Sequence, residues 1–204
     1  MVGVVALAFQ SAGTVLALGG RDGQIRLADL GRQEAAPRDI AAHRGAVNAL
    51  AFDSAGALLA SGGADAIVRL WDVASGDERA ALRGHTRAVT ALAVAGDPAV
   101  LAAAGDDGTI RLWRTGRPEA DPVVIRASTD RLFAVALHPF GRTVATGGAD
   151  GRVMVWPLAE VLAEQACAVA WRQIPDLEWR QLAGPDVPQE RPCGAVTPSA
   201  AVRR

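Results

Sequence analysis

The sequence of 204 residues contains no lysine and no tyrosine, so arginine supplies all of its basic side chains apart from three histidines. The absence of lysine excludes a Walker-type phosphate-binding loop, a Schiff-base enzyme and a lysine general base. The formal net charge is −1, which gives no electrostatic reason to expect a nucleic acid or an anionic membrane as partner. The bias toward alanine, arginine, glycine and proline is typical of a GC-rich bacterial genome.

Cysteines and long apolar runs are also scarce. The two cysteines, Cys167 and Cys193, are too few for a disulfide framework, and we expect ordinary thiols in a cytoplasmic protein. A disulfide or a metal site is the alternative, but no histidine lies nearby to complete a metal site. No apolar run is long enough to span a bilayer. Residues 1–18 are apolar but lack the basic start of a secretion signal, and we interpret them as two strands.

Half of the residues are hydrophobic, as in a globular domain. The sequence also contains an internal repeat. The segment Ser61–Asp72 is repeated as Ala103–Arg114 and Thr146–Pro157, with a more divergent copy at Leu18–Asp29. The aspartates at 22, 65, 107 and 150 lie 43, 42 and 43 residues apart. Self-similarity at about 40–45 residues is typical of propeller blades, each of which is one small sheet.

Each repeat has the pattern of a β-sheet. In the second repeat, residues 47–52 and 58–61 are short runs bounded by turn residues, and residues 67–71 carry a branched or large apolar residue at every second position. Asp-Gly at 22–23, 107–108 and 150–151 predicts tight hairpin turns between the second and third strands, because glycine accepts positive φ angles. Fourth strands are weaker and are expected at 40–42, 79–82 and 123–125.

These repeats resemble WD-repeat β-propellers, with Gly-His early and Trp-Asp late in the repeat. The resemblance implies an all-β fold with four blades over residues 1–157, at about 2–30, 43–73, 85–114 and 128–157. Rings of this family usually have seven blades, and a ring of blades must close to protect its edges. Three alternatives follow for four blades: a fragment of a longer protein, a ring completed by a second copy, or an open arc capped by the C-terminal segment.

In WD-repeat proteins a hydrogen-bonded chain joins four side chains of each blade, and the resemblance carries this lock over to the present sequence. The implied lock residues are His43, Ser61, Asp65 and Trp71 in the second blade, His85, Asp107 and Trp113 in the third, Thr146, Asp150 and Trp156 in the fourth, and Asp22 in the first. Ala103 replaces the hydroxyl in the third blade, and Ser128 replaces the histidine in the fourth. A nucleophilic triad is the alternative, but a catalytic site is needed only once, whereas this set recurs.

The period stops at Pro157. Apolar residues at 158, 161, 162, 166 and 169 have helical spacing, and residues 175–182 predict a second short helix that begins at Pro175. We therefore expect a helical cap over residues 158–194 and a disordered tail over 195–204.

The C-terminal segment also resembles the ending of bacterial STAND-type signalling ATPases whose sensor regions carry WD repeats. The matching positions are Cys167, Arg172, Ile174, Glu178, Trp179, Arg191, Pro192 and Cys193. Trp171 and Pro175 depart from that pattern, and Pro192 directly precedes Cys193. The resemblance implies a terminal sensor portion whose ATPase core is not on this chain.

Propeller ligands bind to loops at the ends of the ring. On the end that carries the loop before each first strand and the turn between second and third strands, we expect these candidate partner-binding residues: Arg21, Arg44, Arg87, Asp106, Asp130 and Arg131. Small residues dominate this end, and no aromatic anchor is evident. His138 is the one histidine outside the lock positions, and we expect it in an exposed turn.

Three functions are consistent with these features. A non-catalytic interaction or sensor module for a protein or peptide is the expected one, with no cofactor and no metal. A regulatory end of a signalling ATPase is the alternative. An enzyme on a propeller scaffold is the third, because a fold does not exclude catalysis; it would need an unrepeated polar cluster, and the sequence contains none.

Overall fold

The computed structural model describes residues 3–11, 13–32, 34, 36–95, 99–140, 143–158 and 200–202. The expected helical cap, apart from Leu158, lies outside the described residues. So do both cysteines and all the positions that resemble the signalling ATPases. No helix among the described residues is long and apolar enough to cross a membrane.

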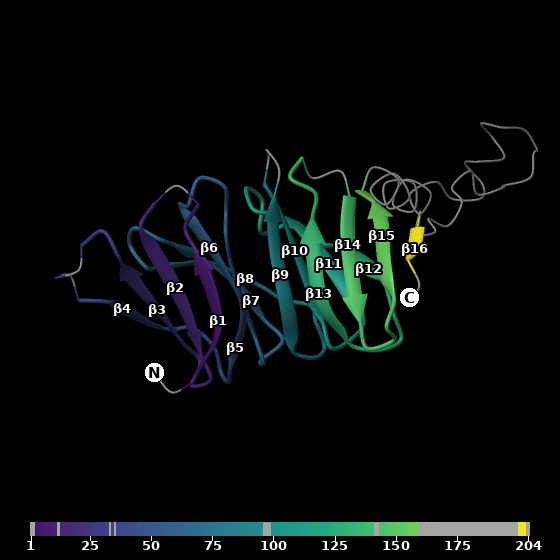
Figure 1. Cartoon of the computed structure of the whole chain (residues 1–204), viewed down its shortest axis with the longest axis horizontal. Coiled ribbons are helices and arrows are strands. Elements are labelled where there is room, and N and C mark those ends of the chain that lie inside the picture. Colours follow the sequence, from purple (N-terminus) through teal and green to yellow (C-terminus); the bar gives the residue numbers. More distant parts are fainter. Residues whose placement is uncertain are drawn as a thin grey trace, which may run out of the picture.

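The described chain forms four antiparallel sheets of four strands each (Figure 1). The first sheet contains β1 (Val4–Phe9), β2 (Val15–Gly20), β3 (Gln24–Asp29) and β4 (Arg38–Ala41). The second contains β5 (Val47–Phe52), β6 (Leu58–Gly63), β7 (Val68–Asp72) and β8 (Glu78–Leu82). The third contains β9 (Val89–Ala95), β10 (Val100–Gly105), β11 (Thr109–Arg114) and β12 (Val123–Arg126). The fourth contains β13 (Leu132–Leu137), β14 (Thr143–Gly148), β15 (Val153–Pro157) and β16 (Ala200–Val202).

The fourth sheet corrects one expectation about the C-terminal residues. Residues 195–204 were expected to be disordered, but Ala200–Val202 pairs antiparallel with β15, with Val153 opposite Val202 and Val155 opposite Ala200. The physical reason is that β15 would otherwise leave a row of unpaired N–H and C=O groups at the sheet edge. A segment from about forty residues further along the chain therefore supplies the fourth strand.

Consecutive sheets pack side by side, and their first strands lie next to one another: β1 contacts β5, β5 contacts β9, and β9 contacts β13. Two side chains tie these inner strands together. The amide of Asn48 donates to the Val89 carbonyl at 2.9 Å, and the hydroxyl of Thr90 donates to the Leu132 carbonyl at 2.7 Å. The first strands therefore form the inner edge of the arc.

Three hydrophobic clusters fill the seams between consecutive sheets. Each seam contains the third-strand tryptophan of the later sheet, which faces the preceding sheet: Trp71, Trp113 or Trp156. The partner side of each seam is built from small residues on the second strand and branched residues on the third, such as Ala17 and Ile25 in the first seam. The seams bury these apolar side chains, so each sheet is stabilised mainly by its neighbours.

The four sheets form an open arc rather than a closed ring (Figure 1). Among the described residues, no strand of the first sheet pairs with a strand of the fourth. The all-β architecture of blade-like sheets agrees with the fold class expected from the repeats, including its incomplete ring.

Candidate functional site

The second sheet contains an uninterrupted chain of hydrogen bonds. The indole N–H of Trp71 donates to Ser61 Oγ at 2.8 Å, and Ser61 Oγ lies 2.7 Å from His43 Nε2. His43 Nδ1 lies 2.9 Å from Asp65 Oδ1. The indole can only donate to the Ser61 hydroxyl, and an ionised Asp65 carboxylate can only accept. Asp65 also accepts backbone N–H groups from Arg44 and Ile67, which fastens the loop to the turn.

The electrostatics around His43 favour a neutral imidazole. Burial lowers its pKa below the ordinary value of 6.5, and the hydrogen bond to Asp65 only partly offsets this effect. The Arg69 guanidinium lies close by, donating to Asp65 Oδ2 at 3.0 Å, and it further disfavours an imidazolium. Burial would raise the pKa of Asp65, but the hydrogen bonds from His43 and Arg69 outweigh it and lower that pKa.

The third sheet keeps only part of this chain. His85 Nδ1 lies 3.0 Å from Asp107 Oδ2, and the Thr109 hydroxyl donates to Asp107 Oδ1 at 2.7 Å. Burial would raise the pKa of Asp107, but hydrogen bonds from Thr109 and from the backbone of Thr86 lower it to about 2. Ala103 stands where Ser61 stands in the second sheet. As a result, His85 Nε2 is buried and finds no hydrogen-bond partner among the described residues.

The fourth and first sheets contain even fewer hydrogen bonds of this chain. The Ser128 hydroxyl donates to Asp150 Oδ2 at 3.1 Å, but it does not replace the missing imidazole. Thr146 Oγ1 and Trp156 Nε1 are buried without a hydrogen-bond partner among the described residues. In the first sheet, Asp22 accepts the backbone N–H of Gln24 at 3.2 Å, as a turn residue does. The lock is therefore complete in the second sheet and partial in the others.

A nucleophilic role does not suit this chain of residues. Ser61 is fully buried between two sheets, and the His43 side chain is equally inaccessible. A nucleophile must reach a substrate carbonyl, whereas this hydroxyl reaches only the tryptophan and histidine of its own sheet. The arrangement is suited to holding each loop against its turn.

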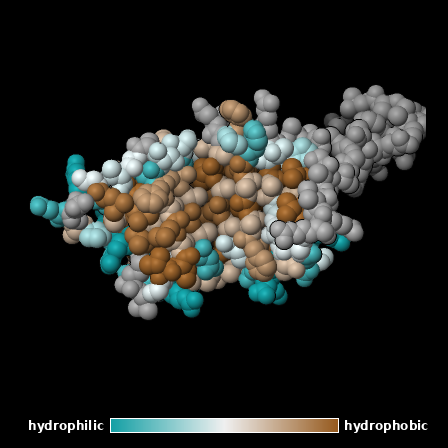
Figure 2. Space-filling view, in the orientation of Figure 1, coloured by the Kyte–Doolittle hydropathy of each residue, from teal (hydrophilic) through white to brown (hydrophobic). Residues whose placement is uncertain are grey.

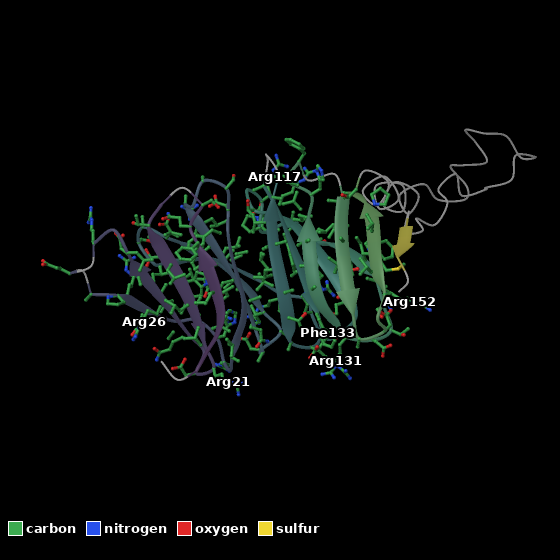
Figure 3. The ribbon with its side chains drawn as sticks, in the orientation of Figure 1. Arg21, Arg26, Arg117, Arg131, Phe133 and Arg152 are labelled. Carbon is green, nitrogen blue, oxygen red and sulfur yellow. The ribbon has the colours of Figure 1, made fainter. Side chains whose placement is uncertain are left out.

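The two kinds of loop that were expected to share one end of the arc are joined by hydrogen bonds in every sheet. The Arg21 N–H donates to the Gly3 carbonyl, and the same bond recurs from Ala64 to Ala46, from Asp106 to Ala88 and from Ala149 to Arg131. The candidate residues Arg21, Arg44, Arg87, Asp130 and Arg131 are exposed there, and Asp106 is half-buried. Figure 3 shows Arg21, Arg131 and Arg152 along this edge of the arc.

Phe133 is a functional candidate that sequence reasoning missed, since no aromatic anchor was expected on this end. It lies on β13 with 54% of its surface exposed, and the Arg131 guanidinium lies 5.8 Å from the ring centroid (Figure 3). The corresponding positions in the preceding two sheets are Asn48 and Thr90, which bond to the next sheet. An aromatic residue at a position that is polar in the two preceding sheets was the available signal.

The remaining groove and the exposed histidine carry few groups that could bind or react with a ligand. A groove of about 460 Å³ lies between the first two sheets, lined by Gln10, Val15, Gly56, Val73 and neighbouring small residues, with Asp72 its one ionisable side chain. His138 is exposed at the end of β13, where its Nδ1 accepts the Phe140 N–H at 3.3 Å. Within the described part of the chain, histidine, cysteine and acidic side chains nowhere gather in threes to suit a metal ion.

Consecutive four-stranded sheets that pack around their first strands, with a buried lock fastening loop to turn, define the class of tandem-blade propeller proteins. The family described as WD domain, G-beta repeat matches residues 37–72, 76–114 and 122–157, more than half of the chain. The chain belongs to this WD-repeat family. No curated protein matches it.

The matched segments and the sheets are offset from one another. Each segment begins just before the fourth strand of one sheet and ends with the third strand of the next, as β4 and β5 to β7 do for residues 37–72. Strands β1 to β3 lie outside the matched segments, in accordance with their divergent sequence. They nevertheless form the same sheet, because the apolar pattern and the Asp-Gly turn are kept.

Proposed function

We propose that this chain is a non-catalytic interaction module that binds a protein or peptide at the end of the arc carrying Arg21, Arg131 and Phe133. The observation that carries the proposal is the half-exposed Phe133 with Arg131 stacked over it, beside loops that present further arginines. Solvent-exposed aromatic and arginine side chains dominate binding energy at protein interfaces. WD-repeat proteins generally serve as scaffolds rather than enzymes, which supports the same function.

The chemistry of this end favours a particular kind of segment. Phe133 offers an apolar contact, and arginine forms two parallel hydrogen bonds with a carboxylate. Exposed Asp130 and Asp150 on the same end disfavour a strongly acidic partner, because like charges repel. We therefore expect a segment with an apolar side chain beside a single carboxylate.

A selection from random twelve-residue peptides displayed on phage, against the full chain, tests this function. Enriched peptides are expected to combine a large apolar residue with Asp or Glu. Their binding should weaken at least about 10-fold in Arg131→Glu and in Phe133→Ser, since each substitution removes one anchor. Arg117→Glu is the matched control, because Arg117 is an exposed arginine at the opposite end of the arc (Figure 3). Equal binding by all four proteins would place the site elsewhere and contradict the proposal.

A role as the sensor end of a STAND-type signalling ATPase is a second, narrower proposal. It is supported only by the C-terminal sequence resemblance, at residues outside the described ones. An ATPase reading frame directly upstream of the coding sequence would favour it, and unrelated neighbouring genes would count against it. A cytoplasmic location likewise stays a prediction.

A further inference from the structure

The first sheet exposes large apolar side chains on one side. Val4, Leu7 and Phe9 of β1 are 48%, 62% and 67% exposed. Figure 2 shows an apolar surface over the part of the arc where Figure 1 places β1 and β2. Contiguous apolar patches on protein surfaces mark contact sites.

The later sheets show what normally covers this side. The residues at the same positions of the repeat are Val47, Leu50 and Phe52 in the second sheet, Val89, Leu92 and Val94 in the third, and Leu132, Val135 and Leu137 in the fourth. All of them pack into a seam against the preceding sheet. Val47 and Val89 are fully buried there, whereas their equivalent Val4 is half-exposed. The exposed side of the first sheet is therefore a seam surface without a preceding sheet.

The fourth sheet carries the complementary surface, which no other described sheet covers. Val153 on β15 is 45% exposed, whereas its equivalents Ile25, Val68 and Ile110 are fully buried under the next sheet. Gly62 shows how close that next sheet comes, since a Cβ on it would lie 2.5 Å from Val89 Cγ1. Among the described residues, a Cβ on the equivalent Gly147 would meet only the Arg152 carbonyl, at 4.0 Å.

The turn glycines give the same result independently. A Cβ on Gly23 would lie 2.1 Å from the His43 carbonyl, and one on Gly108 would lie 2.2 Å from the Ser128 carbonyl, because the loop of the next sheet covers each turn. A Cβ on Gly151, at the same position of the fourth sheet, would meet no atom of the described residues within 4 Å. Both the sheet and the turn are thus shaped for a following blade.

We propose that a second copy of this chain covers both surfaces. The side of β1 and β2 in one copy packs on the side of β14 and β15 in the other, and the same contact forms again at the opposite end of the arc. Each contact repeats a seam that the chain already contains three times, with large side chains against glycine and alanine. The first and fourth sheets lie at the two ends of the arc, and both turn their open sides toward the viewer in Figure 1. One partner can therefore contact both sheets. Two copies then close a ring of eight sheets, and a closed ring has no exposed seam.

The mass of the full chain in solution, measured by light scattering during size exclusion, is the first test. A single species at twice 21.1 kDa is expected at micromolar concentration. A monomer at every accessible concentration would overturn the proposal. A ladder of species beyond the dimer would also overturn it, because an open head-to-tail series means that the ring does not close.

Substitutions on the two surfaces locate the contact. Gly147→Leu is expected to weaken dimerisation at least about 100-fold, since the added side chain fills the space for Val4 of the second copy. The single chain should fold as before, because no described residue of it fills that space. Gly116→Leu is the matched control, at an exposed loop glycine that also has nothing within 4 Å of its Cβ position. Leu7→Glu should weaken dimerisation from the other surface, since it places a charge in an apolar seam.

Mixing the two variants gives the sharpest result. A dimer of Gly147→Leu with Leu7→Glu carries both defects in one seam and leaves the other seam intact, whereas each variant alone damages both seams. The mixture should therefore form a heterodimer more tightly than either variant self-associates, by at least about 10-fold. Unchanged dimerisation in both variants, or no rescue on mixing, would overturn the proposed head-to-tail contact.

Discussion

At the residue scale, Ser61 and Ala103 occupy the same position in consecutive sheets and have opposite consequences for the histidine beside them. Ser61 Oγ accepts from Trp71 and contacts His43 Nε2, whereas Ala103 leaves His85 Nε2 buried and without a partner among the described residues. A buried polar atom without a hydrogen bond costs about 1–3 kcal/mol. The third sheet is therefore less stable than it would be with a hydroxyl side chain at position 103.

We predict that Ala103→Ser stabilises the protein by about 1 kcal/mol, because the new hydroxyl reaches His85 Nε2 as Ser61 reaches His43. Ser61→Ala should cost about 1–3 kcal/mol, since it leaves two buried groups unpaired. Urea denaturation followed by circular dichroism measures both changes. Ala102→Ser is the control: Ala102 is equally buried but lies on the opposite side of β10, so its hydroxyl should destabilise. An Ala103→Ser protein no more stable than the parent would show that the hydroxyl does not complete the lock.

The buried histidines also set a pH dependence. Burial lowers the pKa values of His43 and His85 below 6.5, so below that pH the unfolded chain binds more protons than the folded one. Stability should therefore be greatest above pH 6.5 and fall as the pH decreases through that value. A second loss is expected between pH 3.8 and about 2, where Asp107 is protonated first in the unfolded chain.

Free energies of unfolding measured in urea at pH 8, 6 and 5 test this dependence. In His43→Gln and His85→Gln the slope of stability against pH should become smaller, whatever the absolute stability. If the slope of stability against pH is unchanged when both buried histidines are replaced, other titratable groups cause it.

At the element scale, the hairpin turns differ at one position. Ala66 has a φ of 62°, the one positive φ recorded at a non-glycine residue of the described chain, where the other three sheets carry Gly23, Gly108 and Gly151. An L-residue in this left-handed conformation lowers stability by about 1–2 kcal/mol. Glycine avoids that strain, but it loses more conformational entropy on folding, so only part of the stability is regained.

Ala66→Gly is therefore expected to stabilise the protein by about 0.5–1 kcal/mol. The reverse change should cost more at Gly108 than at Gly151. At Gly108 the new Cβ would lie 2.2 Å from the Ser128 carbonyl, whereas at Gly151 it meets nothing. Thermal unfolding of the three variants, each compared with the parent, gives the order. Equal losses for Gly108→Ala and Gly151→Ala would mean that the loop does not cover the Gly108 turn.

Strands with a clear apolar pattern and turn residues could be predicted from the sequence. A strand that forms only because it pairs with a neighbouring strand could not. The first three strands of each sheet have a repeating apolar pattern, and three of the four sheets have an Asp-Gly turn, which specify these strands locally. The fourth strand of the last sheet, β16, has three small or branched residues far from its partner, and only the unpaired edge of β15 accounts for it. The tight turn at Ala66 likewise forms without glycine because the strands on both sides impose it.

The candidate site was predictable in its positions but not in its contacts. Spacing placed His43, Ser61 and Asp65 at corresponding points of the repeat, and the structure joins them by hydrogen bonds. That Arg69 would join Asp65, or that Arg131 would stack on Phe133, depends on side-chain directions that no period encodes. These contacts arise from packing between strands rather than from sequence order.

At the scale of the whole molecule, the repeats determine each seam but not the number of blades. Each sheet packs against its immediate neighbours, so the sequence of one repeat carries information about the next repeat and none about closure. The exposure of Val4 and Val153 becomes evident only when both ends of the arc are compared with its interior seams. For this reason three ways of completing the arc were consistent with the sequence.

The long stretch of sequence between β15 and β16 has a consequence for synthesis on the ribosome. The first three sheets gain their fourth strands when β4, β8 and β12 emerge, by residues 41, 82 and 126. The fourth sheet has three strands by residue 157, but it lacks its last strand until Ala200–Val202 has been translated. At about 5–20 residues per second, the nascent chain carries an unpaired strand edge for a few seconds. That interval is when a chaperone, or a neighbouring nascent chain on the same messenger RNA, has access to β15.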